Sequence, residues 1–320
     1  MALERNFVIR NVKNALTFTL GLTFLIGCAS HQPPEPEANV GPELSFNFEA
    51  REHENNELIG KFWSPVTQNY ISWQQVDRFL PDGGWLFIGE SLGHPDNERI
   101  ATYLIEHLGR SGRLGAVALE VMNTEQQELL DEHLGERNID EQELNWNPQV
   151  GEWNEVEGIL EASLRYASRV IGADMSNENK NKVRTSQREV AHYSAGHSDY
   201  LANLIYRQFC QVFTQEQAAE MVDVHIARDQ FIAAQIMGAT VPSAVNVFIG
   251  EKGRIRTDYG VPVWLAEDIN VRTLALVPVA ASENPQDYVG STYSGLDPAQ
   301  LFYFIPGFQE SSACAGSTAN

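Results

Sequence analysis

The stretch GGWLFIGESLGHPDNERIATYLIEHL, residues 83–108, indicates the fold class, because it runs from an apolar strand through a short loop into a helix. Trp85–Ile88 is an uninterrupted apolar run, typical of a strand that is buried on both faces. Glu90 follows this strand at once, at its carboxyl end. Beyond the loop, apolar residues recur at helical spacing, at Ile100, Leu104, Ile105 and Leu108.

The same pattern of strand and helix recurs along the chain. Strands alternating with helices predict an α/β fold, a mostly parallel sheet flanked by helices on both faces. The region of about residues 177–240 is long for one crossover and predicts an inserted helical subdomain. Leu301–Ile305 is either an added edge strand or an aromatic plug. The expected strands are Trp85–Gly89, Ala116–Glu120, Val170–Ala173, Ala244–Ile249 and Leu274–Val277, and the clearest helices are Glu98–Leu108, Thr124–Leu134, Val156–Ala167, Tyr200–Phe209 and Gln215–Met237.

The N-terminus has the features of a bacterial lipoprotein signal. Arg5, Arg10 and Lys13 precede an apolar stretch, residues 15–26, that is too short to span a membrane comfortably. It ends in LIGC, in which Cys28 would be lipidated, and the alanine after this cysteine favours the outer membrane. We therefore expect a signal peptide (1–27), a Pro/Glu-rich tether (28–50) and one domain (51–320), anchored in the outer membrane and facing the periplasm or the cell surface.

Composition limits the partners. The chain has 22 Lys and Arg against 43 Asp and Glu, a formal net charge of −21. Such an acidic protein is not expected to bind nucleic acid or anionic lipid head groups generally. Apart from Cys28, the cysteines are Cys210 and Cys314, which could form a disulfide in an oxidising compartment or remain free thiols.

Carboxylates end several of the predicted strands. Glu90, Glu120 and Asp174 each follow an apolar run, and Glu251 follows a fourth. In open α/β sheets, ligands bind at the carboxyl ends of the strands, where these side chains would meet. They would repel one another unless a cation, a proton or an arginine lay between them. The alternative is that some of them merely cap the helices that follow.

Four segments carry a resemblance to a known family: GESLGHPDNERI (89–100), ALEVMNTEQQELLDEHL (118–134), MVDVHIARDQFIAAQI (221–236) and RIRTDYGVPVWL (254–265). In this order, and preceded by IGKFWSPVTQNYISWQQV (59–76), they resemble the ChaN family of haem-binding lipoproteins, which is related to the Tiki and TraB proteins. The resemblance covers about residues 58–268. It implies a parallel α/β fold, a role in haem or iron acquisition, and haem ligated by tyrosine, two haems being stacked between the subunits of a homodimer.

The chain departs from the family at histidine positions. Leu92 replaces the histidine of the family's Gly-Glu-x-His, and His94 lies nearby but out of register. His225 stands four residues before Asp229, where the family usually has glutamine, and Arg254 replaces a late histidine. The family residues that this chain keeps include Glu90, Glu120, Asp229 and Tyr259.

These replacements change the expected chemistry. Arginine only donates hydrogen bonds, so Arg254 cannot ligate a metal, but it can neutralise Glu90 or Glu120. This argues against a divalent metal, although His94 and His225 leave a Tiki-like metal-dependent hydrolase or peptidase as an alternative, with a non-catalytic scaffold as another. His225 and Asp229 could orient each other for proton transfer or merely stabilise their helix.

The sequence therefore favours a protein that binds haem or a similar small ligand over an enzyme. Arg254 and Arg256 are the expected partners of haem propionates. Candidate axial ligands crowd the helical region, at Tyr193, Tyr200, Tyr206, His192 and His197. We predict that the ligand-binding residues are Glu90, His94, Glu120, Asp174, His225, Asp229, Arg254 and Tyr259, and we assign no catalytic residue or metal ligand.

Overall fold

The structure is a computed structural model that describes residues 44–91, 93–148, 151–208 and 214–308. The predicted signal peptide, Cys28, Leu92, Cys210 and Cys314 lie outside the described residues. Residues 44–50, which the sequence placed in the tether, contact the domain: the buried Asp96 carboxylate accepts hydrogen bonds from the backbone N–H groups of Glu49 and Ala50.

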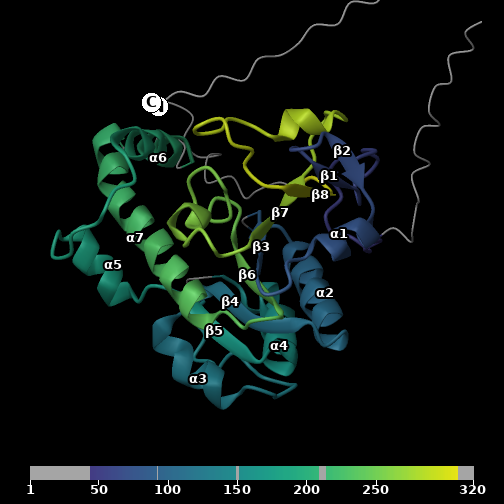
Figure 1. Cartoon of the computed structure of the whole chain (residues 1–320), viewed down its shortest axis with the longest axis horizontal. Coiled ribbons are helices and arrows are strands. Elements are labelled where there is room, and N and C mark those ends of the chain that lie inside the picture. The colour runs from purple at the N-terminus through teal and green to yellow at the C-terminus, as the bar shows by residue number, and fades with distance from the viewer. Residues whose placement is uncertain (1–43, 92, 149–150, 209–213, 309–320) are drawn as a thin grey trace, which may run out of the picture. The chain divides into compact units, whose positions relative to one another are not determined.

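One sheet of eight strands organises the described chain (Figure 1). The spatial order is β2-β1-β8-β7-β3-β6-β4-β5, and the six strands from β8 to β5 run parallel. The predicted α/β class and all five predicted strands are confirmed. The strands are β1 (Phe62–Ser64), β2 (Asn69–Ile71), β3 (Trp85–Glu90), β4 (Leu114–Asn123), β5 (Arg169–Asp174), β6 (Val245–Glu251), β7 (Val271–Pro278) and β8 (Leu301–Ile305).

Both faces of the parallel strands are buried, as the apolar run in β3 predicts. Leu86 and Ile88 face the core formed with α2 (Asn97–Arg110) and α4 (Glu157–Tyr166). Trp85 and Phe87 belong to the core on the opposite face, together with residues of α7 (Gln215–Ala239). Helices on each side exclude water from a sheet whose strands have no polar face.

The remaining helices are shorter or lie farther from the sheet. α5 (Asn177–Arg184) and α6 (Ala195–Gln208) pack on α7 and form small apolar clusters with it. α6 begins before the predicted Tyr200. α1 (Trp73–Phe79) and α3 (Gln127–Glu132) complete the set, and short 3-10 turns cover 124–126, 153–155, 261–264 and 285–288. Within the described residues, no helix combines the length and apolar character needed to cross a membrane.

Strand β8 corrects the expectation for Leu301–Ile305, because it is neither an edge strand nor a plug. It lies inside the sheet, parallel to β7 and antiparallel to β1. All five of its side chains are buried, so it needs cover on both faces and a neighbour on both edges. The second neighbour of β8 is β1 of the β1–β2 hairpin, which the sequence pattern did not predict.

Candidate functional site

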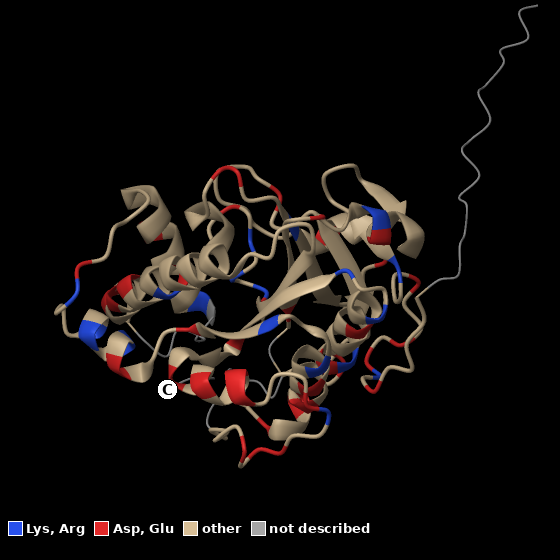
Figure 2. Cartoon of the chain, turned by 60° about the horizontal axis from the view of Figure 1, so that its bottom comes forward, with Lys and Arg blue, Asp and Glu red and all other residues tan. Residues whose placement is uncertain are grey.

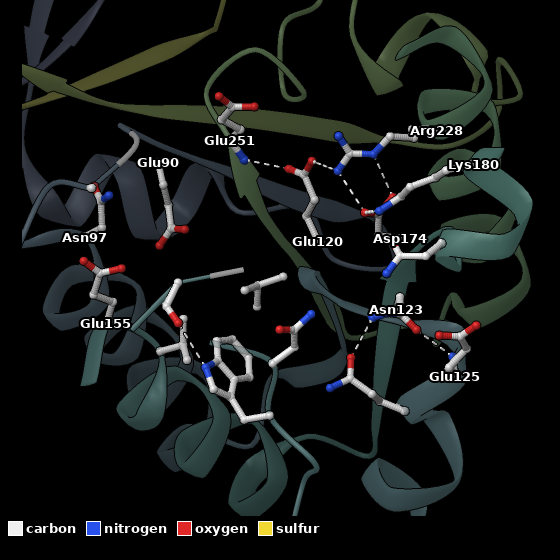
Figure 3. A pocket seen from close by; sticks show the side chains of 18 of the residues that line it. Glu90, Asn97, Glu120, Asn123, Glu125, Glu155, Asp174, Lys180, Arg228 and Glu251 are labelled. Atoms are coloured by element: carbon white, nitrogen blue, oxygen red, sulfur yellow. Dashed lines mark hydrogen bonds and ion pairs between the residues drawn. The ribbon is translucent and has the colours of Figure 1, made fainter. Parts of the chain in front are cut away.

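Carboxylates gather at the carboxyl ends of four adjacent strands. β3 ends at Glu90, β6 at Glu251 and β5 at Asp174, while Glu120 lies in β4 just before that strand ends. The structure thus places Glu90, Glu120 and Asp174 at one edge of the sheet. They line a cavity of about 540 Å³ (Figure 3). Its wall also includes His94, Asn97, Asn123, Glu125, Gln126, Trp146, Glu155, Lys180 and Arg228.

One half of this cavity is charge-compensated. The Arg228 guanidinium donates through Nη2 to Glu120 Oε1 (2.8 Å) and to Asp174 Oδ2 (2.9 Å), and through Nε to Asp174 Oδ1 (2.9 Å). Lys180 Nζ donates to Asp174 Oδ2 at 2.6 Å. Burial raises the pKa of Asp174, but Arg228 and Lys180 outweigh it and hold this pKa below its usual value.

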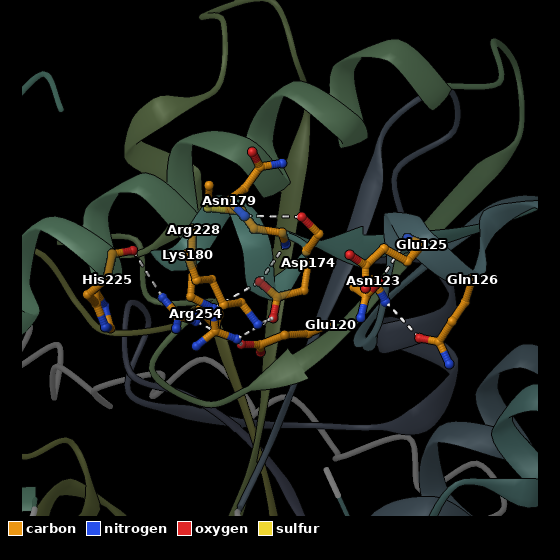
Figure 4. Close-up of polar contacts among 12 residues, drawn as sticks. Glu120, Asn123, Glu125, Gln126, Asp174, Asn179, Lys180, His225, Arg228 and Arg254 are labelled. Carbon is orange, nitrogen blue, oxygen red and sulfur yellow. Dashed lines mark hydrogen bonds and ion pairs between the residues drawn. The ribbon is translucent and has the colours of Figure 1, made fainter. Parts of the chain in front are cut away.

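Glu120 is the centre of a wider network (Figure 4). Its Oε1 also accepts a hydrogen bond from Arg254 Nε at 2.9 Å, and its Oε2 accepts one from the Glu251 backbone N–H at 2.8 Å. Gly250 makes this approach possible, because a Cβ there would lie 2.7 Å from Glu120 Oε2. Both oxygens of the Glu120 carboxylate are therefore held by donors.

Arg254 is buried behind this half, with 2% of its surface exposed. Besides Glu120 it reaches Asp229, whose Oδ1 accepts from Arg254 Nη1 at 2.7 Å. Burial raises the pKa of Asp229 to about 6, even though Arg254 opposes this rise. Arg254 therefore forms the internal ion pair that the sequence suggested, with Glu120 and Asp229 as its partners.

His225 lies on the same helix as Asp229 and is half-buried. Its Nε2 is 3.5 Å from Asp229 Oδ2, yet neither atom has a hydrogen bond within the described chain. Burial, Arg254 and Arg228 together lower the pKa of His225 well below its usual value. The imidazole is therefore neutral near pH 7, and neither residue lines the cavity wall.

Glu90 lies at the other end of the cavity, and Arg254 does not reach it. Of the two partners that the sequence offered for Arg254, Glu90 or Glu120, the structure therefore pairs it with Glu120. The Oε1 atom of Glu90 is buried without a hydrogen-bond partner among the described residues. Burial, together with the charges of Glu120, Glu155 and Glu98, raises the pKa of Glu90 to about 8. Glu90 is therefore mostly protonated at neutral pH.

His94 and Tyr259 have other surroundings. His94 is buried, accepts from the Asp96 backbone N–H through Nδ1 (3.1 Å), and lies 2.9 Å from the Pro306 carbonyl through Nε2. Both of its ring nitrogens are thus engaged, and burial lowers its pKa. Tyr259 lies away from the carboxylates, in the wall of a second cavity of about 230 Å³. Arg256 stacks over its ring at 4.6 Å.

Sequence reasoning missed the two cations of the compensated half, Arg228 and Lys180. Lys180 stands in no motif, and Arg228 lies in the family segment 221–236 without being singled out there. Both come from helices that approach the sheet edge only in the folded chain. The one available signal was a lone arginine next to Asp229 in a long helix. Acidic residues otherwise predominate over the described elements, as the colouring in Figure 2 shows. In the described part of the chain, no three His, Cys, Asp or Glu side chains converge to hold a metal ion.

Comparisons with known proteins identify relatives by family and by fold. A family model described as "Haem-binding uptake, Tiki superfamily, ChaN" matches residues 80–265. The structure described as "Cofacial heme binding to ChaN of Campylobacter jejuni" superposes with a TM-score of 0.61 and 14% identity, covering 76% of this chain and 95% of that one.

Two further structures are more distant. The type III effector HopBA1 has a TM-score of 0.38 and 12% identity, covering 70% of this chain and 88% of its own. A mutant of the erythromycin esterase EreC in its open conformation has a TM-score of 0.41 and 13% identity. This similarity covers 75% of the present chain and 81% of the esterase chain. No curated protein matches the chain.

Proposed function

Because the chain belongs to the ChaN family of haem-binding uptake proteins in the Tiki superfamily, we propose that it binds haem as cargo for iron acquisition. The similar structure from Campylobacter jejuni is described as binding haem cofacially. By analogy, two haems would stack between the two subunits of a homodimer. This arrangement needs an iron-ligating side chain on the surface of the protein. A flat haem bound there can then be covered by the second subunit.

The carboxylate cavity does not suit haem. Haem carries two propionates, and the wall of this cavity contains Glu90, Glu125 and Glu155, while its cations Arg228 and Lys180 are already held by Asp174. Arg254, which the sequence offered as a propionate partner, is buried and bound to Glu120 and Asp229. Arg256 is likewise held, by both oxygens of Asp258.

A group of aromatic side chains near α6 suits haem better. The proposal depends on the exposed position of Tyr193 in this group. The residue is 61% exposed, and its ring meets the rings of Trp264 and His197 edge-on, with centroids 6.2 and 5.7 Å away. Nearby, the Tyr293 ring packs on His197. A phenolate oxygen is a good ligand for haem iron, and the surrounding rings offer apolar contact to the porphyrin. On this exposed surface, the propionates would point to solvent.

The test is a titration of the full-length protein, in detergent, with haemin. We expect a red-shifted Soret band, a charge-transfer band typical of phenolate ligation, and about one haem per chain. Tyr193→Phe keeps the ring but removes the ligand, so it should abolish the phenolate signature. Tyr70→Phe is the matched control, because Tyr70 is 51% exposed on the distant β1–β2 hairpin. Equal spectra for wild type and Tyr193→Phe would rule out this ligand.

The cell-envelope location is part of the same proposal. It rests on the lipoprotein signal that ends at Cys28, which would anchor the protein in the outer membrane. Cys28→Ser should move the protein out of the membrane fraction. An unchanged distribution between membrane and soluble fractions would contradict the anchor without affecting the haem titration.

A further inference from the structure

In the second half of the carboxylate cavity, no Lys or Arg is among the described residues that line the wall, and the proposed haem site does not use this half. Figure 3 shows Glu90 pointing into the cavity opposite Glu155. The charges that act on Glu90 are those of Glu120, Glu155 and Glu98, all of them negative. The Oε1 atom of Glu90 is fully buried and finds no donor in the described chain. A buried acceptor without a donor costs free energy unless a ligand satisfies it.

Among the described residues, the cations closest to this cavity have partners other than Glu90. Arg228 and Lys180 lie in the opposite half and bind Asp174. Lys252 follows the adjacent strand β6, and its Nζ lies 3.5 Å from Ser91 Oγ. Glu251, at the end of β6, adds another carboxylate to the wall. A ligand entering between Glu90 and Glu155 would therefore meet negative charge, and no described Lys or Arg forms an ion pair with Glu90.

The wall near Glu90 and Glu155 also includes polar and aromatic side chains. Asn97 is held by Ser91, whose backbone carbonyl accepts from its amide. The Trp146 indole donates from Nε1 to the Gly151 carbonyl at 3.0 Å and packs edge-on against Trp153. Sites for organic cations commonly combine an aromatic ring with carboxylates that lack an ion pair. The aromatic ring contacts both the charged group and the carbon chain of the cation.

We propose that this half of the cavity binds a small primary amine, with its ammonium group between Glu90 and Glu155 and its carbon chain along Trp146. An ammonium group has three donors and can satisfy both carboxylates at once. The whole cavity has a volume of about 540 Å³, so one half of it leaves room for a small aliphatic diamine. The carboxylates are spread around the wall instead of converging on one point, which suits an extended cation better than a bare metal ion.

Binding is expected to release a proton. Burial and the neighbouring carboxylates keep Glu90 protonated at neutral pH, and an ammonium ion beside it would favour the ionised form. Glu120 is already paired with Arg228 and Arg254, and Glu155 lies at the exposed rim. Affinity should therefore rise between pH 6 and pH 8.5, while an aliphatic amine remains charged.

The experiment is calorimetric titration of the full-length protein in detergent with putrescine, at pH 7.5, in phosphate and in Tris. The wild type should bind with an enthalpy that differs between the buffers, because a proton is released. Glu90→Gln, which keeps the shape of the side chain, should weaken binding at least about tenfold and remove the buffer dependence. Glu125→Gln is the matched control, a carboxylate on the opposite wall, and should change affinity less than about threefold.

Three results would overturn the proposal. The first is the absence of putrescine binding at millimolar concentration at pH 8.5. The second is equal affinity of wild type and Glu90→Gln. The third is displacement of putrescine by Mg²⁺ at low concentration, which would make this an inorganic cation site. Butane-1,4-diol, which has the same length but no charge, should not bind. Haem binding measured on the same samples is independent of each outcome.

Discussion

Two ends of one cavity hold the same kind of side chain in opposite electrostatic states. Glu120, in β4, is surrounded by Arg228, Arg254 and a backbone N–H. Glu90, only two strands away in the sheet, forms no ion pair with a described residue and has a pKa raised to about 8. Their position at strand ends is the same, so the difference arises from what the rest of the chain brings to each.

Helix α7 accounts for much of this difference. It packs over β4 and β5, where its Arg228 meets both Glu120 and Asp174. The loop after β6 brings Arg254 to the same place. Neither cation extends as far as β3. Whether a carboxylate at a strand end has a structural role or is available for a ligand therefore depends on the cations that neighbouring helices and loops bring to it. Its position in the strand does not determine this role.

Removing Arg254 should have the largest effect. Arg254→Ala leaves Glu120 and Asp229 without their buried partner, and we expect it to lower the free energy of unfolding by about 3–5 kcal/mol at pH 7.5. The loss should shrink below about pH 6, because Asp229 then takes up a proton and no longer needs the cation. Urea denaturation at pH 7.5 and pH 5.5 measures both values. A decrease in the free energy of unfolding of less than 1 kcal/mol at pH 7.5 would show that Arg254 does not stabilise the network around Glu120.

Arg228→Ala should cost less, about 1–3 kcal/mol, although Arg228 contacts two carboxylates. Its side chain is 24% exposed, so water screens the charges, and Lys180 still neutralises Asp174 after the substitution. Added salt should reduce this loss but leave the Arg254→Ala loss nearly unchanged. Denaturation in 50 mM and 500 mM NaCl tests the difference. Equal salt dependence of the two variants would contradict the distinction between a buried and a half-exposed arginine.

At the uncompensated end, substitution should stabilise the protein. The pKa of Glu90 is about 8 in the folded state against 4.5 unfolded. The folded state therefore holds a proton that the unfolded state has lost, and the contribution of Glu90 to stability falls as pH rises from 4.5 through 8. Glu90→Gln cannot ionise, so it should be more stable than wild type by roughly 1–3 kcal/mol at pH 9 and nearly equal at pH 5.

Thermal and urea denaturation across this pH range provide the measurement. Glu125→Gln, which removes an exposed carboxylate from the cavity wall, should stay within about 0.5 kcal/mol of wild type at both pH values. If Glu90→Gln were as neutral as Glu125→Gln at pH 9, Glu90 would be ionised without penalty, and the two ends of the cavity would not differ.

The sequence predicted the parts of the fold that depend on local pattern. The five apolar strands and the gathering of Glu90, Glu120 and Asp174 follow from the pattern of apolar runs and from the rule that parallel strands end at one edge. The pairing of Arg254 with Glu120 followed from its replacement of a family histidine. Its second partner, Asp229, and the isolation of Glu90 depend on strand order, which no local pattern encodes.

Other features were beyond the sequence for a similar reason. Arg228 is one residue from Asp229 in α7, but only the packing angle of the helix directs it to the sheet edge. The β1–β2 hairpin has strands of three residues, too short for a periodic signal. Tyr193 was one of five candidate haem ligands, and the 61% exposure on which we base its choice is a tertiary property.

The place of β8 has a consequence for how the chain reaches its native state. Phe62 in β1 pairs with Tyr303 in β8, so these partners are separated by most of the domain. Contacts of such long range are slow to form, because a large loop must close before any pairing energy is gained. During synthesis the free edge of β1 in the β1–β2 hairpin therefore stays unpaired until β8 has been made. A chain that stops before Leu301 would leave the edges of both β1 and β7 exposed, and self-association through those edges is the expected result.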